Sequence, residues 1–366
     1  MIKMKIVHVT PGFYPTVGGI QKYVEDLCLN LIRLGHQSDV ITYDRHTITG
    51  EKLRRYEKYK GINIYRLPFY GPGIYPMAPG ILKKIKDYDI VHVHGVGVSC
   101  DILSLTKIFH RKHMILSSHG GIFHTNKSSL AKRLYFFIWC RQELKNFDRI
   151  IAVSRNDEEL FSRISKRTVF IPNGIDLGMY AGIKRKPKKN TLLFIGRLSP
   201  NKRIDMLIEV VNLLKKDMPD VKLYVAGSEW KDERKKLEAM VSEKKLERNV
   251  IFTGEVSEKE KLSLLSRAEL FVSASEYEGF GISVVEAMAA GLPVVLNNIE
   301  AFKNLVNNRK SGFLTDFSKP EIAKKLILKL KNQNLSGISG NAKKEAKKYD
   351  WKNLVKRIGD VYEKCI

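Results

Sequence analysis

Short runs rich in β-branched residues alternate with longer amphipathic stretches along most of the chain. This alternation is typical of parallel α/β layers, in which a helix follows each strand and packs on the sheet. In the first half, it predicts strands at 3–9, 37–42, 62–66, 89–94, 113–118, 149–153 and 168–171, and helices at 19–34, 78–86, 98–110, 128–146 and 155–165. The predicted fold class is therefore α/β with doubly wound sheets.

The alternation is interrupted by the polar, charged stretch 183–190, which is typical of a domain linker. A chain of 366 residues is long enough for two domains of ordinary size. Beyond the stretch the pattern restarts, with strands predicted at 191–196, 221–226, 249–253, 269–273, 293–296 and 312–314. We predict two Rossmann-like domains that face each other across a cleft. The first is 1–180, completed by a C-terminal helix within 350–366, and the second is 181–349.

The composition is strongly basic, because 64 Lys and Arg against 39 Asp and Glu give a net charge of +25. Nucleotide sugars, anionic lipid head groups and nucleic acid could all be attracted by this charge. A lysine-rich surface of a heat-adapted protein explains it equally well. Four scattered cysteines without a C-x-x-C pair favour reduced thiols in a cytoplasmic protein. The N-terminus is too short and charged for a signal peptide, so we expect any membrane contact to be peripheral.

The most informative motif is the run 275–295. A predicted strand at 270–274 leads into a loop that contains Glu278 and two glycines, and an apolar helix starts at about Ile282 with Glu286 in its first turn. Such a turn presents backbone N–H groups and the positive end of a helix, which suits phosphate. Carboxylates beside it suit sugar hydroxyls. The predicted ligand therefore carries both phosphate and sugar.

A second loop supplies positive charge. Arg197 and Lys202 follow the predicted strand 191–196, five residues apart. The planar Arg fork and the Lys point charge can together hold two phosphates and neutralise a departing nucleoside diphosphate.

These two motifs resemble those of the family-4 retaining glycosyltransferases (glycosyl transferases group 1), which have the GT-B fold. The segment from Glu278 to Glu286 resembles the family's E-x7-E signature, and 196–202 resembles its G-R-x-x-x-x-K element. The resemblance implies that Arg197 and Lys202 bind the donor phosphates, that Glu278 faces the donor sugar and that Glu286 faces the ribose. The further donor contacts that it implies are Val256, Gly279, Phe280, Gly281 and Ile282.

Two sets of residues in the first half are weaker signals by themselves. The resemblance places Gly18 and Gly19, at a predicted helix start, across the donor diphosphate. It matches His119, after the strand 113–118, to the family's active-site histidine near the donor sugar. His92 and His94 share one face of a strand, but no carboxylate or cysteine stands at ligand spacing nearby, so we expect a structural strand end and no metal site.

The resemblance implies a retaining, metal-independent transfer of a hexosyl group from a UDP- or GDP-linked sugar to a glycan or lipid-linked acceptor, without a cofactor. The base stays open because 228–230 (Ser-Glu-Trp) departs from the family's pattern of a second Gly and a Pro. The turn 171–176 resembles the family's PNG[VI]D element, and we expect a positive φ at Gly174. The basic, aromatic stretches 50–60 and 127–145 favour peripheral association with an anionic membrane, although a core-packed helix explains the second equally well.

Two other functions compete with this one. A nucleotide-sugar epimerase or hydrolase of GT-B-like fold would share the phosphate-binding residues, but it needs a further carboxylate or histidine set that the sequence does not present. A non-enzymatic binder of anionic polymers would explain the charge. The basic residues are dispersed, however, and no RNA or DNA module is recognisable, so we expect no nucleic-acid partner.

Overall fold

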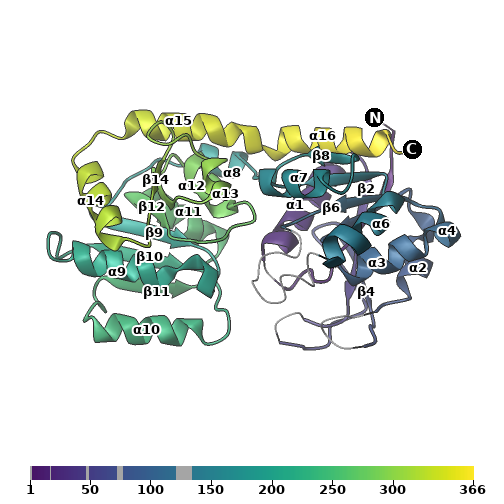
Figure 1. Cartoon of the computed structure of the whole chain (residues 1–366), viewed down its shortest axis with the longest axis horizontal. Helices are drawn as coiled ribbons and strands as arrows, with labels where there is room; N and C mark the ends of the chain where they lie inside the picture. The colour runs from purple at the N-terminus through teal and green to yellow at the C-terminus, as the bar shows by residue number, and fades with distance from the viewer. Residues whose placement is uncertain (1, 17, 47–48, 72–76, 121–133) are drawn as a thin grey trace. The chain divides into compact units, whose positions relative to one another are not determined.

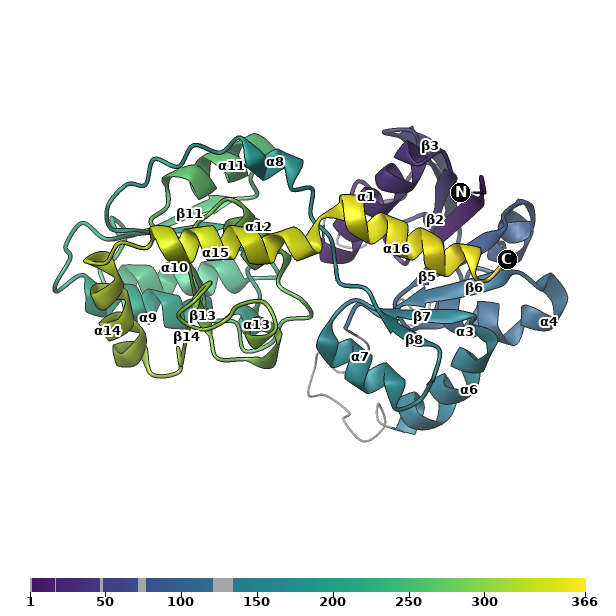
Figure 2. The same cartoon turned by 90° about the horizontal axis from the view of Figure 1, so that it is seen from above.

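A computed structural model describes residues 2–16, 18–46, 49–71, 77–120 and 134–366. The chain forms two compact units, drawn in Figures 1 and 2. Unit 1 comprises Met1–Gly174 and Trp351–Ile366, and unit 2 comprises Ile175–Asp350. Each unit is built on its own largely parallel sheet with helices on both faces, which confirms the predicted fold class.

Unit 1 holds an eight-stranded sheet of order β3-β4-β2-β1-β5-β6-β7-β8. Its strands are β1 (Lys5–Val9), β2 (Gln37–Tyr43), β3 (Tyr56–Tyr59), β4 (Ile62–Leu67), β5 (Ile90–His94), β6 (His113–Ser117), β7 (Arg149–Ala152) and β8 (Thr168–Phe170). All neighbours pair in parallel except β3 and β4. The edge strand β3 was missed because its Tyr-Glu-Lys-Tyr sequence is half exposed and lacks an apolar run.

The helices of unit 1 are α1 (Gly19–Arg33), α2 (Ile81–Lys84), α3 (Val98–Leu105), α4 (Lys107–His110), α6 (Arg141–Glu143), α7 (Arg155–Ser162) and α16 (Trp351–Glu363). The amphipathic helix α16 packs beside α1, where both contribute to one hydrophobic core (Figure 2). The helix predicted at 128–146 is confirmed over the described residues 134–146, but it is not a regular α-helix throughout. The chain there forms a π-helix, η2 (Tyr135–Cys140), then α6 and the 3₁₀ turn η3 (Leu144–Asn146). Residues 128–133 lie outside the described ranges.

Gly174 is required for packing rather than for a turn with positive φ. The prediction of a positive φ is wrong, since Gly174 is not among the glycines with that conformation. A Cβ added there would lie 2.5 Å from Cδ2 of Trp351. The indole ring of Trp351 is almost fully buried and occupies the space that a side chain at 174 would need.

Unit 2 holds a six-stranded parallel sheet of order β11-β10-β9-β12-β13-β14. Its strands are β9 (Thr191–Ile195), β10 (Lys222–Ala226), β11 (Val250–Gly254), β12 (Leu270–Ser273), β13 (Val294–Asn297) and β14 (Phe313–Thr315). Its helices are α8 (Gly178–Ala181), α9 (Ile204–Leu214), α10 (Glu233–Glu243), α11 (Glu258–Arg267), α12 (Ile282–Ala289), α13 (Glu300–Lys303), α14 (Pro320–Lys331) and α15 (Ser336–Ala346). They enclose two cores, one with α9, α10 and α14 and one with α11, α12 and α15. In the described part of the chain, no helix combines the length and apolar character needed to cross a bilayer.

The polar stretch 183–190 belongs to unit 2 and does not separate the units. The backbone N–H groups of Lys186 and Lys188 donate to the carbonyls of Ser266 and Arg267 at 2.9 and 2.8 Å. The division falls earlier, after Gly174, and again after Asp350. The stretch is charged because it runs along the exposed surface of unit 2, and this exposure produces the same composition as a linker.

We predict that Gly174→Ala lowers the free energy of unfolding of unit 1 by about 1–3 kcal/mol, because the new methyl group clashes with the Trp351 ring. The matched control is Gly359→Ala within α16, where no described atom outside that helix lies within 4 Å of the added Cβ. It should stabilise by up to about 1 kcal/mol, because alanine favours a helix interior. Scanning calorimetry measures both changes. Equal effects of the same sign would contradict the packing argument.

Candidate active site

The loop after β9 depends on two glycines that pack against each other. Gly227, which follows β10, has a φ of +149°, and a Cβ added to it would lie 2.0 Å from the carbonyl oxygen of Gly196. This close approach fixes the path of the chain into Arg197. The exposed guanidinium of Arg197 lies 5.1 Å from the ring centre of Trp230, within the range of a cation–π contact. The divergent loop 228–230 therefore supports a predicted phosphate-binding residue.

Lys202 and Glu278 are brought together although they are 76 residues apart in the sequence. Lys202 ends the 3₁₀ turn η4 (Pro200–Lys202), and its Nζ donates to Oε1 of Glu278. Ser275 Oγ donates to the same oxygen at 3.2 Å. The neighbouring Asn201 Nδ2 donates to the carbonyl of Tyr277 at 3.1 Å, which ties the turn to the loop after β12. The pair is mostly buried, with side chains 17% and 15% exposed.

The start of α12 provides backbone donors. Gly281 stands before the first helical residue, Ile282, with φ at +98°, in the left-handed region that favours glycine. No side chain caps this end of α12. Gly279 has open space around it, whereas the Phe280 ring is buried and packs edge-on against Tyr349. Residues 279–282 therefore offer backbone N–H groups, and the Phe280 side chain contributes to the core.

Glu286 lies in the second turn of α12 rather than in the predicted first turn. It is buried, and its Oε1 accepts from Lys261 Nζ at 2.7 Å and from Tyr180 OH at 2.8 Å. Burial alone would lower the pKa of Lys261, but the Glu286 and Glu258 carboxylates raise it above its usual value.

Sequence reasoning missed Lys261 and Tyr180. The available signal was that Lys261 stands four residues before the buried Leu265, on the apolar face of α11, where a charged side chain needs a partner. The predicted donor contact Val256 precedes Ser257, the N-cap of the same helix. The loop of Val256 and the carboxylate of Glu286 are thus both positioned by α11.

In unit 1, Gly18 and Gly19 stand at the start of α1. Gly18 is the N-cap residue and has extended backbone, and no side chain caps the helix. No described atom lies within 4 Å of a Cβ added to Gly19. The positive end of a 15-residue helix is thus accessible to an anion.

His119 lies just beyond β6, with a left-handed backbone (φ 48°). The adjacent residues are fixed by Asp157 of α7, which accepts from Ser118 Oγ at 2.6 Å and from the Gly120 N–H at 3.0 Å. The ring of His119 contacts a histidine cluster, because its Nε2 lies 3.1 Å from Nδ1 of His94.

This cluster lies on one face of the sheet and contains His8, His92 and His94, all buried. Their nitrogen atoms lie within 4.8 Å of one another, so the group has the composition of a possible metal site. Ring nitrogens of these histidines already form hydrogen bonds with neighbouring side chains. His92 contacts Tyr362 OH at 2.6 Å and Ser117 Oγ at 2.8 Å through its two nitrogens. Sequence reasoning recognised His92 and His94 as a pair but missed His8, which pairs with His92 across β1 and β5.

Burial keeps these histidines neutral. It lowers the pKa of His8 and of His119 to about 3, and it lowers the pKa of His92 and His94 well below the usual value. A neutral imidazole carries one N–H donor and one acceptor nitrogen. The cluster is therefore a hydrogen-bonding group at neutral pH rather than a charged one.

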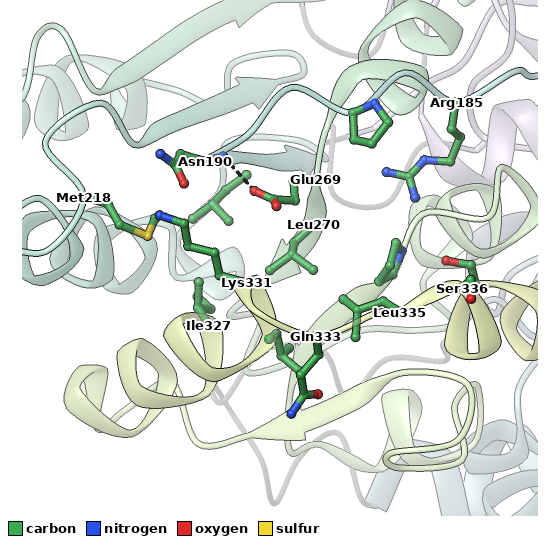
Figure 3. Close-up of a pocket in the computed structure, with 15 residues that line it drawn as sticks. Arg185, Asn190, Met218, Glu269, Leu270, Ile327, Lys331, Gln333, Leu335 and Ser336 are labelled. Carbon is green, nitrogen blue, oxygen red and sulfur yellow. Dashed lines mark hydrogen bonds between the residues drawn. The ribbon is translucent and has the colours of Figure 1, made fainter.

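Unit 2 also contains a pocket of about 210 Å³ at the opposite edge of its sheet (Figure 3). Leu192, Leu270 and Pro293, near the amino ends of three strands, contribute to its lining. Arg185 extends toward it, and its guanidinium donates to the carbonyls of Gly291 and Ala268. The pocket shares no lining residue with the predicted site.

Within each unit, the predicted residues collect on loops that follow strands and on the first turns of the helices after those loops. In unit 2 these loops follow β9, β11 and β12, and in unit 1 they follow β1 and β6. In open parallel sheets, ligands bind at this edge. The fold and these loops together define a glycosyltransferase of the GT-B type.

The chain belongs to glycosyltransferase family 4. The model named Glycosyltransferase Family 4 matches residues 17–178, and the model named Glycosyl transferases group 1 matches residues 181–352. The chain is 33% identical to GDP-mannose:cellobiosyl-diphosphopolyprenol alpha-mannosyltransferase from Xanthomonas campestris, over 99% of this chain and 97% of that protein. The protein of the same name from Komagataeibacter xylinus is 32% identical over 86% of this chain and 80% of its own length.

Solved structures support the same fold. Sucrose-phosphate synthase from Thermosynechococcus elongatus aligns with a TM-score of 0.81 at 20% identity, covering 99% of each chain. HepE from Anabaena, solved with UDP and glucose, aligns with a TM-score of 0.80 at 19% identity, covering 99% of this chain and 100% of its own. These findings confirm the resemblance seen in the sequence and the assignment of the protein as a transferase.

We predict that unit 1 loses stability selectively in mild acid. His8, His92, His94 and His119 stay neutral when folded but bind protons below about pH 6.5 when unfolded, so stability present at pH 7 is lost as pH falls. Burial raises the pKa of the Glu143 carboxyl to about 9, and that of Asp26 and Asp157 above the usual value, which opposes part of this loss. The net slope should be roughly 3 kcal/mol per pH unit between about pH 6 and pH 5.

Unit 2 is the internal control for this prediction, because residues 175–350 contain no histidine. Scanning calorimetry between pH 7 and pH 5 should show the unit 1 transition falling toward acid while the unit 2 transition stays nearly constant. Two transitions that move in parallel would show that the buried histidines do not control the acid response.

Proposed function

We propose that the protein transfers a mannosyl group from GDP-mannose to a lipid-linked saccharide diphosphate, with retention of the α configuration and without a metal ion or cofactor. The observation that carries this proposal is the mostly buried Lys202–Glu278 pair, which lies on loops beside the uncapped start of α12. GDP-mannose and a polyprenyl diphosphate acceptor appear in the names of relatives that match this chain over almost its full length. Those names state an alpha-mannosyltransferase, and the proposal of retention rests on the resemblance to the retaining family.

The proposed mechanism rests on stabilising the leaving diphosphate. As the glycosidic bond breaks, negative charge grows on the phosphate oxygens. Arg197, Lys202 and the N–H groups at residues 279–282 are donors that can stabilise it. Glu278 holds Lys202 in place before the donor arrives, so little reorganisation is needed during the reaction. Glu286, fixed by Lys261 and Tyr180, is suited to accept hydrogen bonds from ribose hydroxyls. His119 supplies a neutral hydrogen-bonding group for the donor sugar.

We also propose that unit 1 binds an anionic membrane surface at the cytoplasmic face, where a lipid-linked acceptor would be reached. Ile108 and Phe109 on α4 are 71% and 79% exposed, which is unusual for large apolar side chains. Lys107 and Arg111 stand on either side of them in the sequence. Apolar residues flanked by cations are typical of interfacial membrane contacts. Of the two basic, aromatic stretches that predicted membrane association, 50–60 includes the edge strand β3.

The exposed apolar residues continue on η2, the described part of the stretch 127–145. Ile138 and Trp139 are also exposed, and Trp139 Nε1 donates to Asp101 of α3 at 3.3 Å. Tyr135 OH donates to the same oxygen of Asp101 at 3.0 Å. These bonds tie η2 to the helix that leads into α4, so both elements can contribute to one membrane-binding surface.

The donor assignment predicts that GDP and GDP-mannose raise the melting temperature of the protein more than UDP or UDP-glucose do, without added metal.

Lys202→Ala should lower kcat/KM for transfer roughly 10²–10³-fold, because it removes a preorganised cation from the leaving group. Lys235→Ala is the control, since that side chain is 80% exposed. If GDP-mannose raises the melting temperature but the protein releases free mannose without an acceptor, the hydrolase alternative would be favoured. Equal rates for both variants would refute the site.

The membrane assignment predicts that Phe109→Ser weakens binding to vesicles containing phosphatidylglycerol roughly tenfold, because one buried aromatic side chain contributes about 2 kcal/mol. Ile322→Ser is the matched control, since Ile322 is an exposed apolar residue (47%) on α14 of unit 2. Vesicle co-sedimentation at moderate salt measures both. Wild-type protein that stays in the supernatant would rule out the surface.

A further inference from the structure

A chain of four hydrogen-bonding side chains crosses the sheet of unit 1 and ends at His119. Ser38 Oγ lies 3.0 Å from Nε2 of His8. Nδ1 of His8 lies 2.9 Å from Nε2 of His94, and Nδ1 of His94 lies 3.1 Å from Nε2 of His119. In every link, the Nε2 of a histidine faces the preceding group of the chain, so all three links run in the same direction.

The sheet topology explains this arrangement. The four residues come from β2, β1, β5 and the end of β6, which are consecutive neighbours in the sheet. His8 of β1 is paired with Val40 of β2 and with His92 of β5. Ser38 lies two residues before Val40, and His94 lies two residues after His92. Residues two apart in a strand share a face. The chain therefore runs diagonally along one face, from near the amino end of β2 to the carboxyl edge of the sheet.

Neutral imidazoles in such a chain cannot choose their tautomers independently. Burial lowers the pKa of His8, His94 and His119, so each ring carries one proton on nitrogen. If the Nδ1 of one ring carries the proton, it donates a hydrogen bond to the Nε2 of the next ring, which must then be unprotonated. That next ring therefore carries its own proton on Nδ1. The three rings are therefore all protonated on Nδ1 or all on Nε2. The first state leaves Nδ1 of His119 as a donor, and the second leaves it as an acceptor.

The buried end of the chain favours the first state. Among the described residues, the hydrogen-bond partner of the buried Ser38 Oγ is Nε2 of His8, at 3.0 Å. If Ser38 accepted a hydrogen bond from His8, its own buried hydroxyl hydrogen would have no acceptor among the described residues, which is costly. If Ser38 donates to His8 Nε2, the hydroxyl hydrogen has a strong acceptor and is not left unpaired.

We propose that Ser38, His8 and His94 are positioning residues that fix His119 in the Nδ1–H tautomer, so that it presents a hydrogen-bond donor to an oxygen of the donor substrate. The contact between His119 and the donor substrate rests on the proposed function, whereas the tautomer of His119 does not. The ligands of glycosyl transfer, hydroxyl and phosphate oxygens, are acceptors that match this donor. Ser38 thus acts on the substrate through three intervening rings.

A metal site in the same cluster is the competing interpretation. Two nitrogens bound to one tetrahedral zinc ion stand roughly 3.3 Å apart, from bond lengths near 2.0 Å. The nitrogens of His8 and His94 are closer than this, at 2.9 Å, and they point at each other as hydrogen-bond partners. Both nitrogens of His92 are also engaged, with Tyr362 and Ser117. The geometry of the described residues favours the hydrogen-bonded chain.

The test is ¹⁵N-histidine NMR of the whole protein without ligand, which distinguishes nitrogens with and without a proton. Wild-type His8, His94 and His119 should all carry the proton on Nδ1. Ser38→Ala should produce an Nε2–H population at His119, and Ser38→Thr, which keeps the hydroxyl, should restore the wild-type pattern. Protons on Nε2 in the wild type, or no change at His119 in Ser38→Ala, would overturn the proposal. So would zinc that copurifies with the cluster and is released only by a chelator.

Kinetics provide the second readout, with Ser117→Ala as the matched control. Ser117 is a buried strand residue that hydrogen-bonds His92, outside the chain. Ser38→Ala should lower kcat with GDP-mannose about fivefold, the equivalent of one hydrogen bond, while Ser117→Ala leaves it unchanged. Equal kcat values for the two variants would overturn the positioning role. Absence of turnover in the wild type, with the NMR pattern as predicted, would count against the proposed function alone.

Discussion

The parallel pairing of the strands is the constraint on which both units depend. Parallel strands all end at the same edge, and each is followed by a loop that leads into a helix. In unit 2, this places Lys202, which follows β9, beside Glu278, which follows β12, because these two strands are neighbours. In unit 1, it aligns histidines from β1 and β5 with His119 after β6. Distant parts of the sequence meet without a long excursion of the chain.

The two carboxylates of the E-x7-E motif are held differently. Each pairs with a lysine, but Glu278 does so on loops at the sheet edge, whereas Glu286 does so inside α12, with Lys261 and Tyr180 around it. Mostly buried carboxylates without a cation would repel an incoming diphosphate and would be costly to desolvate. The paired lysines remove both problems. The motif alone therefore describes half of the arrangement, since its partners come from α11 and from the loop after β9.

Much of the fold could be predicted from the sequence, because buried parallel strands are short apolar runs with an unambiguous pattern. The edge strand β3 could not, since its half-exposed Tyr-Glu-Lys-Tyr sequence carries no such signal. The boundary between the units was displaced toward 183–190, because exposure gives a surface segment the same charged composition as a linker. At the candidate site, Arg197, Lys202 and Glu278 could be proposed from their spacing and from the family resemblance. Lys261 and His8 were not, because their importance arises from contacts with residues far away in the sequence.

The course of the chain has a consequence for synthesis on the ribosome. Unit 2 is built from one continuous segment, whereas unit 1 takes its last helix, α16, from residues beyond it. Until that helix has been made, the space beside Gly174 that the Trp351 ring fills is empty, and α1 lacks a neighbour in its core. Unit 2 can therefore complete its folding first, and the earlier-made unit 1 has to remain unfinished, with apolar surface exposed, until α16 has been translated.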